Sequence, residues 1–284
     1  MTETNAQVPM YYWGIPDSPL NWCELDYKVS PFICEFYNTI SSFVLSMFGV
    51  YGLYLLFNSS FTDKSLSHHI KIVSQLGIRA KVTLSYLSLA IIGIGSAFYH
   101  ATLLYKYQLF DEFPMIITIS LFVYCKLTLD QVQDTDSSQY KIFRKILPYL
   151  LTGYVVTVAA IITVIRDIPT ILQASFGFLV LVCVTLSSQY ARSIKMDLRN
   201  SNPKKLLAYC VGSMLVAYLC WLVERKLCSD GYVIPGVQLH AIWHVLTGAA
   251  AYLWVQYYIC INLEKHNYKT KLIYSMGIPS IRVQ

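Results

Sequence analysis

Charge is what this sequence has least of. Only 13% of its 284 residues are Asp, Glu, Lys or Arg, whereas a soluble domain carries about 25%. Hydrophobic residues make up 55% of the chain, and its mean hydropathy is +0.47. This composition excludes an ordinary soluble enzyme. It also excludes a disordered chain and a nucleic-acid-binding protein, because both of those classes are rich in charge. The sequence therefore predicts an integral membrane protein.

Long apolar windows follow one another along the chain, each with about the twenty residues that a helix needs to cross a bilayer. We expect an all-α bundle of seven transmembrane helices at residues 32–262. A lumenal segment at 1–31 precedes it, and a cytosolic tail at 263–284 follows it. The seven predicted spans are Phe32–Phe57, Ala80–Leu104, Leu109–Leu129, Ile146–Ile165, Ile168–Ala191, Lys205–Val223 and Gly236–Ile261.

The start of the sequence lacks the features of a secretory signal peptide. Residues 1–31 have no basic stretch followed by an apolar core. They carry Asp17, Glu24 and Asp26 instead. We therefore expect the first span to act as its own insertion signal.

Basic residues are divided unevenly between the two sides of the predicted bundle. Of the 22 Lys and Arg residues, seventeen fall on the side opposite the N-terminus. Basic loops stay in the cytosol, so we expect a lumenal N-terminus and a cytosolic C-terminus. Only an odd number of spans allows this, which favours seven. It also places the N-glycosylation motif at Asn58 in the cytosol, where we expect no glycan. The five basic residues on the N-terminal side are Lys28, Lys106, Arg166, Arg225 and Lys226.

None of the eight cysteines has the C-x-x-C spacing of a structural zinc site. Cys23 and Cys228 lie outside the predicted spans on the lumenal, oxidising side, so a disulfide between them is one prediction and two free thiols are the alternative. The other six fall in apolar windows and read as small buried hydrophobic residues. These are Cys34, Cys125, Cys183, Cys210, Cys220 and Cys260.

Four ionisable side chains stand inside or at the edge of apolar spans, where such groups are costly and mark functional sites. They are His100, Asp111, His240 and His244. The second span exits on the lumenal side, and the third and seventh spans enter from that side. We therefore expect all four side chains to lie at a similar depth in the lumenal half of the membrane.

The two histidines of the seventh span are four residues apart, so both imidazoles project from one helix face. This spacing suits two ligands of one metal ion, but the Glu of an H-E-x-x-H protease is absent. His100, from another helix, would complete a three-histidine zinc site with an open fourth position, as in catalytic sites. The alternative is that His240 and His244 are interfacial histidines without a metal.

Two further residues extend this hypothesis to catalysis. Ser96 lies one helical turn before His100 and is positioned to stabilise an oxyanion. Alternatively, its hydroxyl bonds the backbone of its own helix. Asp111 is a candidate general base for the attacking water, or it orients a ligating histidine.

An oxygen-rich cluster precedes the first span. Carboxylate and amide side chains at alternating positions, together with a backbone carbonyl, suit a hard cation such as calcium. The alternative is a solvated acidic segment. The candidate ligands are Asn21, Trp22 through its carbonyl, Glu24, Asp26 and Glu35.

Taken in order, these motifs resemble those of the alkaline ceramidases over about residues 13–255. The resemblance implies a seven-helix amidase of the endoplasmic reticulum, with the Golgi as the alternative, that hydrolyses ceramide to a sphingoid base and a fatty acid. The motifs are Asn21-Trp22-Cys23-Glu24 with Glu35-Phe36-Tyr37-Asn38-Thr39, then Gly95-Ser96 and His100, then Leu109-Phe110-Asp111-Glu112-Phe113-Pro114-Met115, and finally His240-Ala241-Ile242-Trp243-His244-Val245-Leu246-Thr247-Gly248.

The resemblance also implies a role for each site residue. His100, His240 and His244 match zinc ligands, Ser96 and Asp111 match a catalytic pair, and Cys23 and Cys228 match a disulfide. Asn21, Trp22, Glu24, Asp26 and Glu35 match a calcium site. The sequence departs from the family pattern at three positions. Asn21 replaces the usual Asp, Asp26 replaces the usual Asn, and Tyr99 replaces Phe.

Two other functions remain open at this point. One is a seven-helix receptor related to the progestin and adipoQ receptors, which share a three-histidine zinc site but place the N-terminus in the cytosol. The other is a transporter or proton relay that uses the histidines without a metal.

We expect a ceramide-type lipid and the bilayer as partners, with neither nucleic acid nor an obligate protein partner. The residues Ser280–Gln284 contain no KDEL-type signal for retention in the endoplasmic reticulum, so they do not decide between that compartment and the Golgi.

Overall fold

The computed structural model describes residues 11–58, 64–129, 137–166, 168–193, 202–232, 234, 236–275 and 277–284. These residues are mostly helical and form eight helices and one two-stranded sheet. Four residues used in the predictions lie outside the described part: Ser59 and Ser60 of the motif at Asn58, and Lys195 and Arg199 among the seventeen basic residues opposite the N-terminus.

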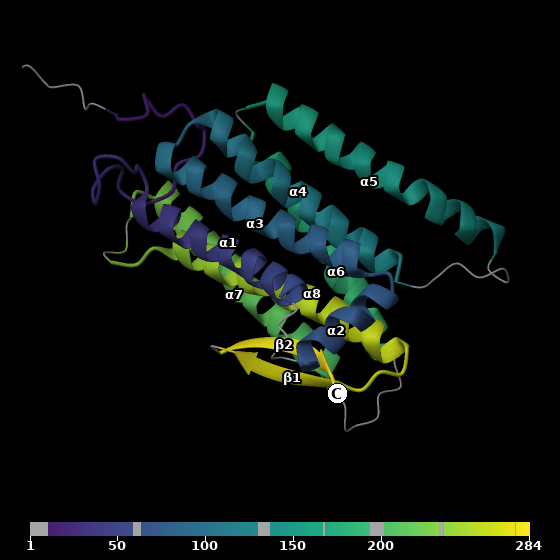
Figure 1. The fold of residues 1–284 in the computed structure, drawn as a ribbon. Coiled ribbons are helices and arrows are strands. Elements are labelled where there is room, and N and C mark those ends of the chain that lie inside the picture. The colour runs from purple at the N-terminus through teal and green to yellow at the C-terminus, as the bar shows by residue number, and fades with distance from the viewer. Residues whose placement is uncertain are drawn as a thin grey trace, which may run out of the picture.

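Seven long helices correspond to the seven predicted spans (Figure 1). Six of them are long and apolar enough to cross a bilayer, which indicates a multi-pass membrane protein. The seventh, α8, is as long as the others, but its histidines, tyrosines and amides make it more polar. The helices are α1 (Phe36–Phe57), α3 (Arg79–Thr102), α4 (Tyr105–Leu127), α5 (Ser138–Val164), α6 (Thr170–Ser193), α7 (Asn202–Ser229) and α8 (Leu239–Lys265).

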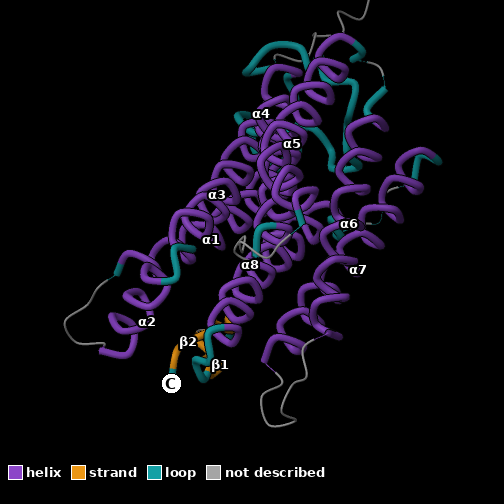
Figure 2. The backbone as a smooth tube through the Cα atoms, turned by 90° about the vertical axis from the view of Figure 1, so that its right-hand side faces the viewer, coloured by secondary structure: helices purple, strands orange, loops and turns teal. Residues whose placement is uncertain are grey.

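Two elements were not predicted. A short helix, α2 (Lys64–Gln75), lies between α1 and α3. The segment predicted as a tail contains an antiparallel hairpin of β1 (Thr270–Ser275) and β2 (Ile278–Val283). The hairpin packs on α8 and α2, and the Ile281 N–H donates to the Gln256 side chain at 2.7 Å. Both views place α2 and the hairpin at the same end of the bundle (Figure 1, Figure 2).

The opposite end of the bundle, which we call the site end, gathers three segments that are far apart in the sequence. The N-terminal segment, residues 11–35, contacts the turn between α3 and α4 through a hydrogen bond from Ser18 N–H to the Leu103 carbonyl. It is joined to the end of α7 through Cys23 and Cys228. All three predicted zinc ligands belong to helix turns at this end.

α8 lies at the centre of the bundle, packed against α1, α3 and α7. Its second half is almost fully buried, from Tyr252 to Leu263. By contrast, α5, α6 and α7 leave most of their residues unburied. Helices that are apolar on all sides are suited to a lipid environment. The polar residues of the site lie instead on the more buried helices α1, α3, α4 and α8.

Small residues allow α1 and α3 to pack in close contact. A Cβ atom added at Gly49 would lie 2.5 Å from the backbone N of Ala90, and one added at Gly93 would lie 2.4 Å from the backbone N of Ser46. Membrane helices commonly approach through such small residues because larger side chains would hold the backbones apart. This contact brings the polar face of α1 against the turn of α3 that carries the site.

Gly95 is needed for a similar contact between α3 and α4. A Cβ atom at this position would lie 2.1 Å from the carbonyl oxygen of Phe110, a backbone atom that cannot move alone. We expect Gly95→Ala to push the two helices apart and to destabilise the protein by about 1–3 kcal/mol. The measurement is the thermal unfolding midpoint of purified protein in detergent.

Gly153→Ala is the matched control, because a Cβ atom there meets nothing within 4 Å. It replaces the same residue type in another long helix, so it should leave the midpoint unchanged. Equal unfolding midpoints for Gly95→Ala and Gly153→Ala would show that the backbones of α3 and α4 do not make this close contact.

Candidate active site

Three buried histidines meet at the site end of the bundle. His100 belongs to the last turn of α3, and His240 and His244 belong to the first two turns of α8. One ring nitrogen from each lies within 4.8 Å of the others. Within the described part of the chain, no other group of three His, Cys, Asp or Glu residues gathers in this way. The structure brings the three histidines together, as the order of the spans predicts; their depth in the lumenal half of the membrane stays a prediction.

The chemistry of these nitrogen atoms fits a metal ion. His100 Nε2 and His240 Nδ1 are buried without a hydrogen-bond partner among the described residues, and buried polar atoms rarely remain unsatisfied. His244 Nδ1 lies 2.8 Å from Ser41 Oγ, so its Nε2 is directed to the other side of the ring. Three imidazole nitrogens are a donor set typical of zinc.

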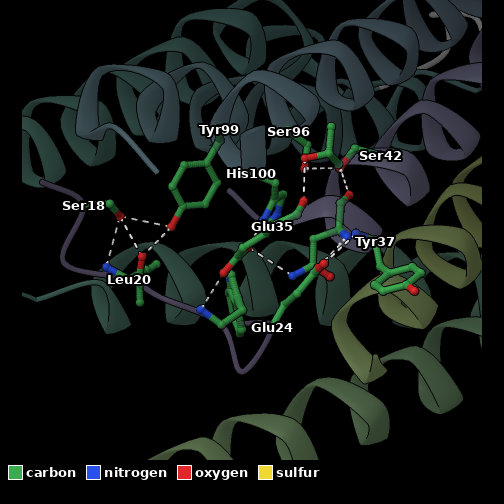
Figure 3. A network of polar contacts seen from close by, with 12 residues as sticks. Ser18, Leu20, Glu24, Glu35, Tyr37, Ser42, Ser96, Tyr99 and His100 are labelled. Atoms are coloured by element: carbon green, nitrogen blue, oxygen red, sulfur yellow. Dashed lines mark hydrogen bonds and ion pairs between the residues drawn. The ribbon is translucent and has the colours of Figure 1, made fainter. Parts of the chain in front are cut away.

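Glu35 orients His100. Its Oε2 lies 2.5 Å from His100 Nδ1, and the carboxylate also accepts hydrogen bonds from the Trp22 backbone N–H and the Asn38 side chain, each at 3.1 Å (Figure 3). The Glu35 side chain is fully buried. A carboxylate on one ring nitrogen fixes the histidine with its other nitrogen free for a metal. Glu35 therefore contacts the histidine centre as well as the predicted calcium segment.

Trp22 supports a second histidine. Its indole ring stacks on the His240 imidazole, with the ring centroids 3.7 Å apart and the planes at 14°. The backbone N–H of Trp22 also donates to Glu35. Trp22 therefore contacts His240 directly and His100 through Glu35.

Ser96 and Asp111 lie beside the histidines. Ser96 is buried, its hydroxyl lies 3.4 Å from His244 Nε2, and it accepts a hydrogen bond from Ser42 at 3.0 Å. Its hydroxyl is also hydrogen bonded to the Asp111 carboxylate. The partners described for Ser96 are thus side chains of the site and not carbonyls of its own helix. The structure brings all five predicted zinc and catalytic residues together.

The predicted calcium ligands are less closely gathered. Glu24 accepts hydrogen bonds from the N–H groups of Tyr37 and Asn38, at 2.7 and 2.9 Å, in the first turn of α1. Burial raises the pKa of Glu24, although these N–H groups oppose the shift. Burial also raises the pKa of Asp26, whose carboxylate is hydrogen bonded to the side chains of Cys34 and Asn21.

Charge balance nevertheless fits a cation in this segment. Glu24 and Glu35 are both buried, and neither forms an ion pair with a lysine or arginine among the described residues. Buried carboxylates without a positive partner are costly. Their oxygen atoms are the ligand type that calcium prefers, so the calcium site stays a prediction that these residues fit.

The predicted disulfide is present. Cys23 and Cys228 are joined, with their Cα atoms 5.4 Å apart, and the alternative of two free thiols is wrong. The bond attaches the N-terminal segment to the end of α7, next to the residues that stack on and orient the histidines. The other six cysteines are free, and all but Cys220 are buried.

Several residues of the site were missed by sequence reasoning. Asn38, Ser41 and Ser42 form a polar face at the start of α1, and their spacing of three and four residues was a signal that could have found them. Glu224 of α7 is also buried, and its carboxylate faces the backbone N–H groups of His240 and Cys23. A glutamate near the end of an apolar span was its signal.

Comparison with known proteins points to one family. The family model described as Ceramidase matches residues 14–282. The chain is 58% identical to "Putative alkaline ceramidase dcd3B" of Dictyostelium discoideum over 95% of this chain and 96% of that protein. It is 28% identical to alkaline ceramidase 3 of Mus musculus, over 94% and 92% of the two chains. It is 29% identical to alkaline ceramidase YPC1 of Saccharomyces cerevisiae, over 86% and 76%. The chain therefore belongs to the alkaline ceramidase family.

Proposed function

We propose that this protein is a zinc-dependent ceramidase, which hydrolyses the amide bond of ceramide to a sphingoid base and a free fatty acid. One observation carries the proposal. Three buried histidines with unsatisfied ring nitrogens converge on a hydrogen-bonded Ser96–Asp111 pair inside an apolar helical bundle. The names of the relatives support the same substrate.

The reaction needs a nucleophile, a proton acceptor and a donor to the oxyanion. Zinc held by His100, His240 and His244 would supply Lewis acidity and lower the pKa of water toward neutrality. Asp111 accepts the proton as the oxygen of water bonds to the ceramide carbonyl carbon. When the carbon–nitrogen bond breaks, Asp111 returns that proton to the leaving amine, which departs as the sphingoid base.

Ser96 donates a hydrogen bond to the oxyanion that forms on the carbonyl oxygen. Ser42 donates to Ser96 Oγ at 3.0 Å, and the Ser96 hydroxyl, which bonds Asp111 in this structure, would turn its proton to the carbonyl oxygen when the substrate binds. Glu35 keeps His100 Nδ1 occupied, so the orientation of that ring does not change during the reaction.

The proposal extends to the placement of the site. We propose seven spans, with α8 as the seventh, a lumenal N-terminus and a cytosolic C-terminus in the endoplasmic reticulum. Calcium would bind the Asn21–Glu35 segment and balance its buried carboxylates. A site at the lumenal end of the bundle would let the two hydrocarbon chains of ceramide stay in apolar surroundings while the amide reaches the histidines.

The test is the release of sphingoid base from ceramide by the purified full-length protein. Ser96→Ala should lower kcat by about 100- to 1,000-fold, the loss typical for an oxyanion donor. Ser88→Ala is the control, because Ser88 lies on the same helix two turns away and its described hydrogen bond is to the Ser85 carbonyl of that helix. Wild-type protein that releases no sphingoid base would contradict the function. Full activity in Ser96→Ala would contradict the role of Ser96.

A further inference from the structure

The hydroxyl of Tyr99 points away from the histidine centre and toward the N-terminal segment. Tyr99 precedes His100 on α3 and is only 2% exposed. Its hydroxyl donates to the Leu20 carbonyl at 2.8 Å and lies 3.0 Å from Ser18 Oγ (Figure 3). A buried phenol needs polar partners, and here both partners come from a segment about eighty residues away in the sequence.

Ser18 extends this contact to α4. Its Oγ lies 2.8 Å from Gln108 Oε1, and the Gln108 amide donates to Glu112 at 2.8 Å. Glu112 neighbours Asp111, the predicted general base. The Tyr99 hydroxyl therefore stands where α3, α4 and the N-terminal segment meet, between the helix turn of His100 and the helix turn of Asp111.

The same segment also satisfies the backbone of the turn between α3 and α4. The Ser18 N–H donates to the Leu103 carbonyl at 3.2 Å, and Asp17 accepts from the Tyr105 N–H at 2.7 Å. Helix ends leave such groups without partners, and a carboxylate at a helix N-terminus is favourable. Leu103 itself has a left-handed backbone, with φ at 50°, so this turn depends on its partners.

We propose that Tyr99 is a positioning residue. Its hydroxyl holds the segment Asp17–Leu20 against the turn between α3 and α4, and this contact fixes the position of His100 relative to Asp111. This inference rests on the proposed function and adds to it a residue that directs the geometry of the site. Tyr99 contributes no atom to the reaction, because its hydroxyl is bonded to the N-terminal segment.

The test is Tyr99→Phe in the full-length protein, which removes the hydroxyl and keeps the ring packed on Cys34 and Leu103. Two lost hydrogen bonds predict a fall in kcat of about 5- to 30-fold per zinc-loaded molecule, with KM and zinc content near wild type. Ser18→Ala should give a similar loss. The double variant should lose much less than the product of the two, because both variants break one network.

Tyr107→Phe is the matched control, since Tyr107 lies just beyond the turn and no hydrogen bond of its hydroxyl is described; it should retain activity within about two-fold. Hydrogen exchange gives a readout that does not depend on activity. The amides of Ser18, Leu103 and Tyr105 should exchange faster in Tyr99→Phe than in wild type.

The outcomes separate the two claims. Unchanged amide exchange together with a wild-type kcat in Tyr99→Phe overturns the positioning role. Independent, multiplicative losses in Tyr99→Phe and Ser18→Ala also overturn it. An inactive wild-type protein overturns the proposed function instead. Faster amide exchange in Tyr99→Phe would then still support the contact between Tyr99 and the N-terminal segment.

Discussion

His240→Ala is expected to abolish both zinc binding and ceramide hydrolysis. His240 supplies one of three ring nitrogens that lie within 4.8 Å of one another, and two imidazoles alone cannot complete the site. Loss of a hydrogen-bond partner of a zinc ligand already costs about 10- to 100-fold in affinity or activity. Loss of the ligand itself should therefore exceed about 100-fold. The measurements are zinc per purified chain and the rate of sphingoid-base release.

His68→Ala is the control for this prediction. His68 is exposed on α2, at the end of the bundle that carries the β-hairpin, so its loss should change neither zinc content nor rate. A His240→Ala variant that keeps one zinc per chain and the wild-type rate would exclude the three-histidine centre.

Asp111→Asn is expected to remove most of the activity while the metal remains bound. The substitution keeps the size of the side chain and its contact with Ser96, but an amide cannot accept the proton from water. Loss of general acid–base catalysis costs about 100- to 10,000-fold. Because the change affects proton transfer and not binding, kcat should fall while KM stays near its wild-type value.

Glu112→Gln gives a close comparison for Asp111→Asn. The two carboxylates are adjacent in the sequence, but Glu112 bonds Gln108 and not Ser96. We expect Glu112→Gln to keep its kcat within several-fold of wild type. Equal losses in the two variants would mean that Asp111 has no special role in proton transfer.

The helices were predictable because hydropathy reports what faces lipid. Each predicted span corresponds to a long helix, with ends displaced by up to about eight residues. Short elements were not predictable in this way. The helix α2 has too few apolar residues to resemble a span, and β1 and β2 are six residues each. The hairpin is held by contacts such as Ile281 to Gln256, which exist only once α8 is in place.

The histidine centre was predictable for a different reason. Spacing on one helix and the alternating direction of the spans together placed His100, His240 and His244 at one depth. What the sequence could not show is how they are supported. Glu35 on His100 and Trp22 on His240 depend on how the N-terminal segment folds back on the bundle. No local pattern encodes that arrangement.

We propose that three histidines hold a catalytic zinc ion. The most direct test removes metal from the purified wild-type protein with a chelator and then adds zinc back in measured steps, while bound zinc and ceramide hydrolysis are followed together. We expect activity to rise in proportion to bound zinc and to saturate at one zinc ion per chain. Full ceramide hydrolysis by protein that contains no metal would contradict this proposal.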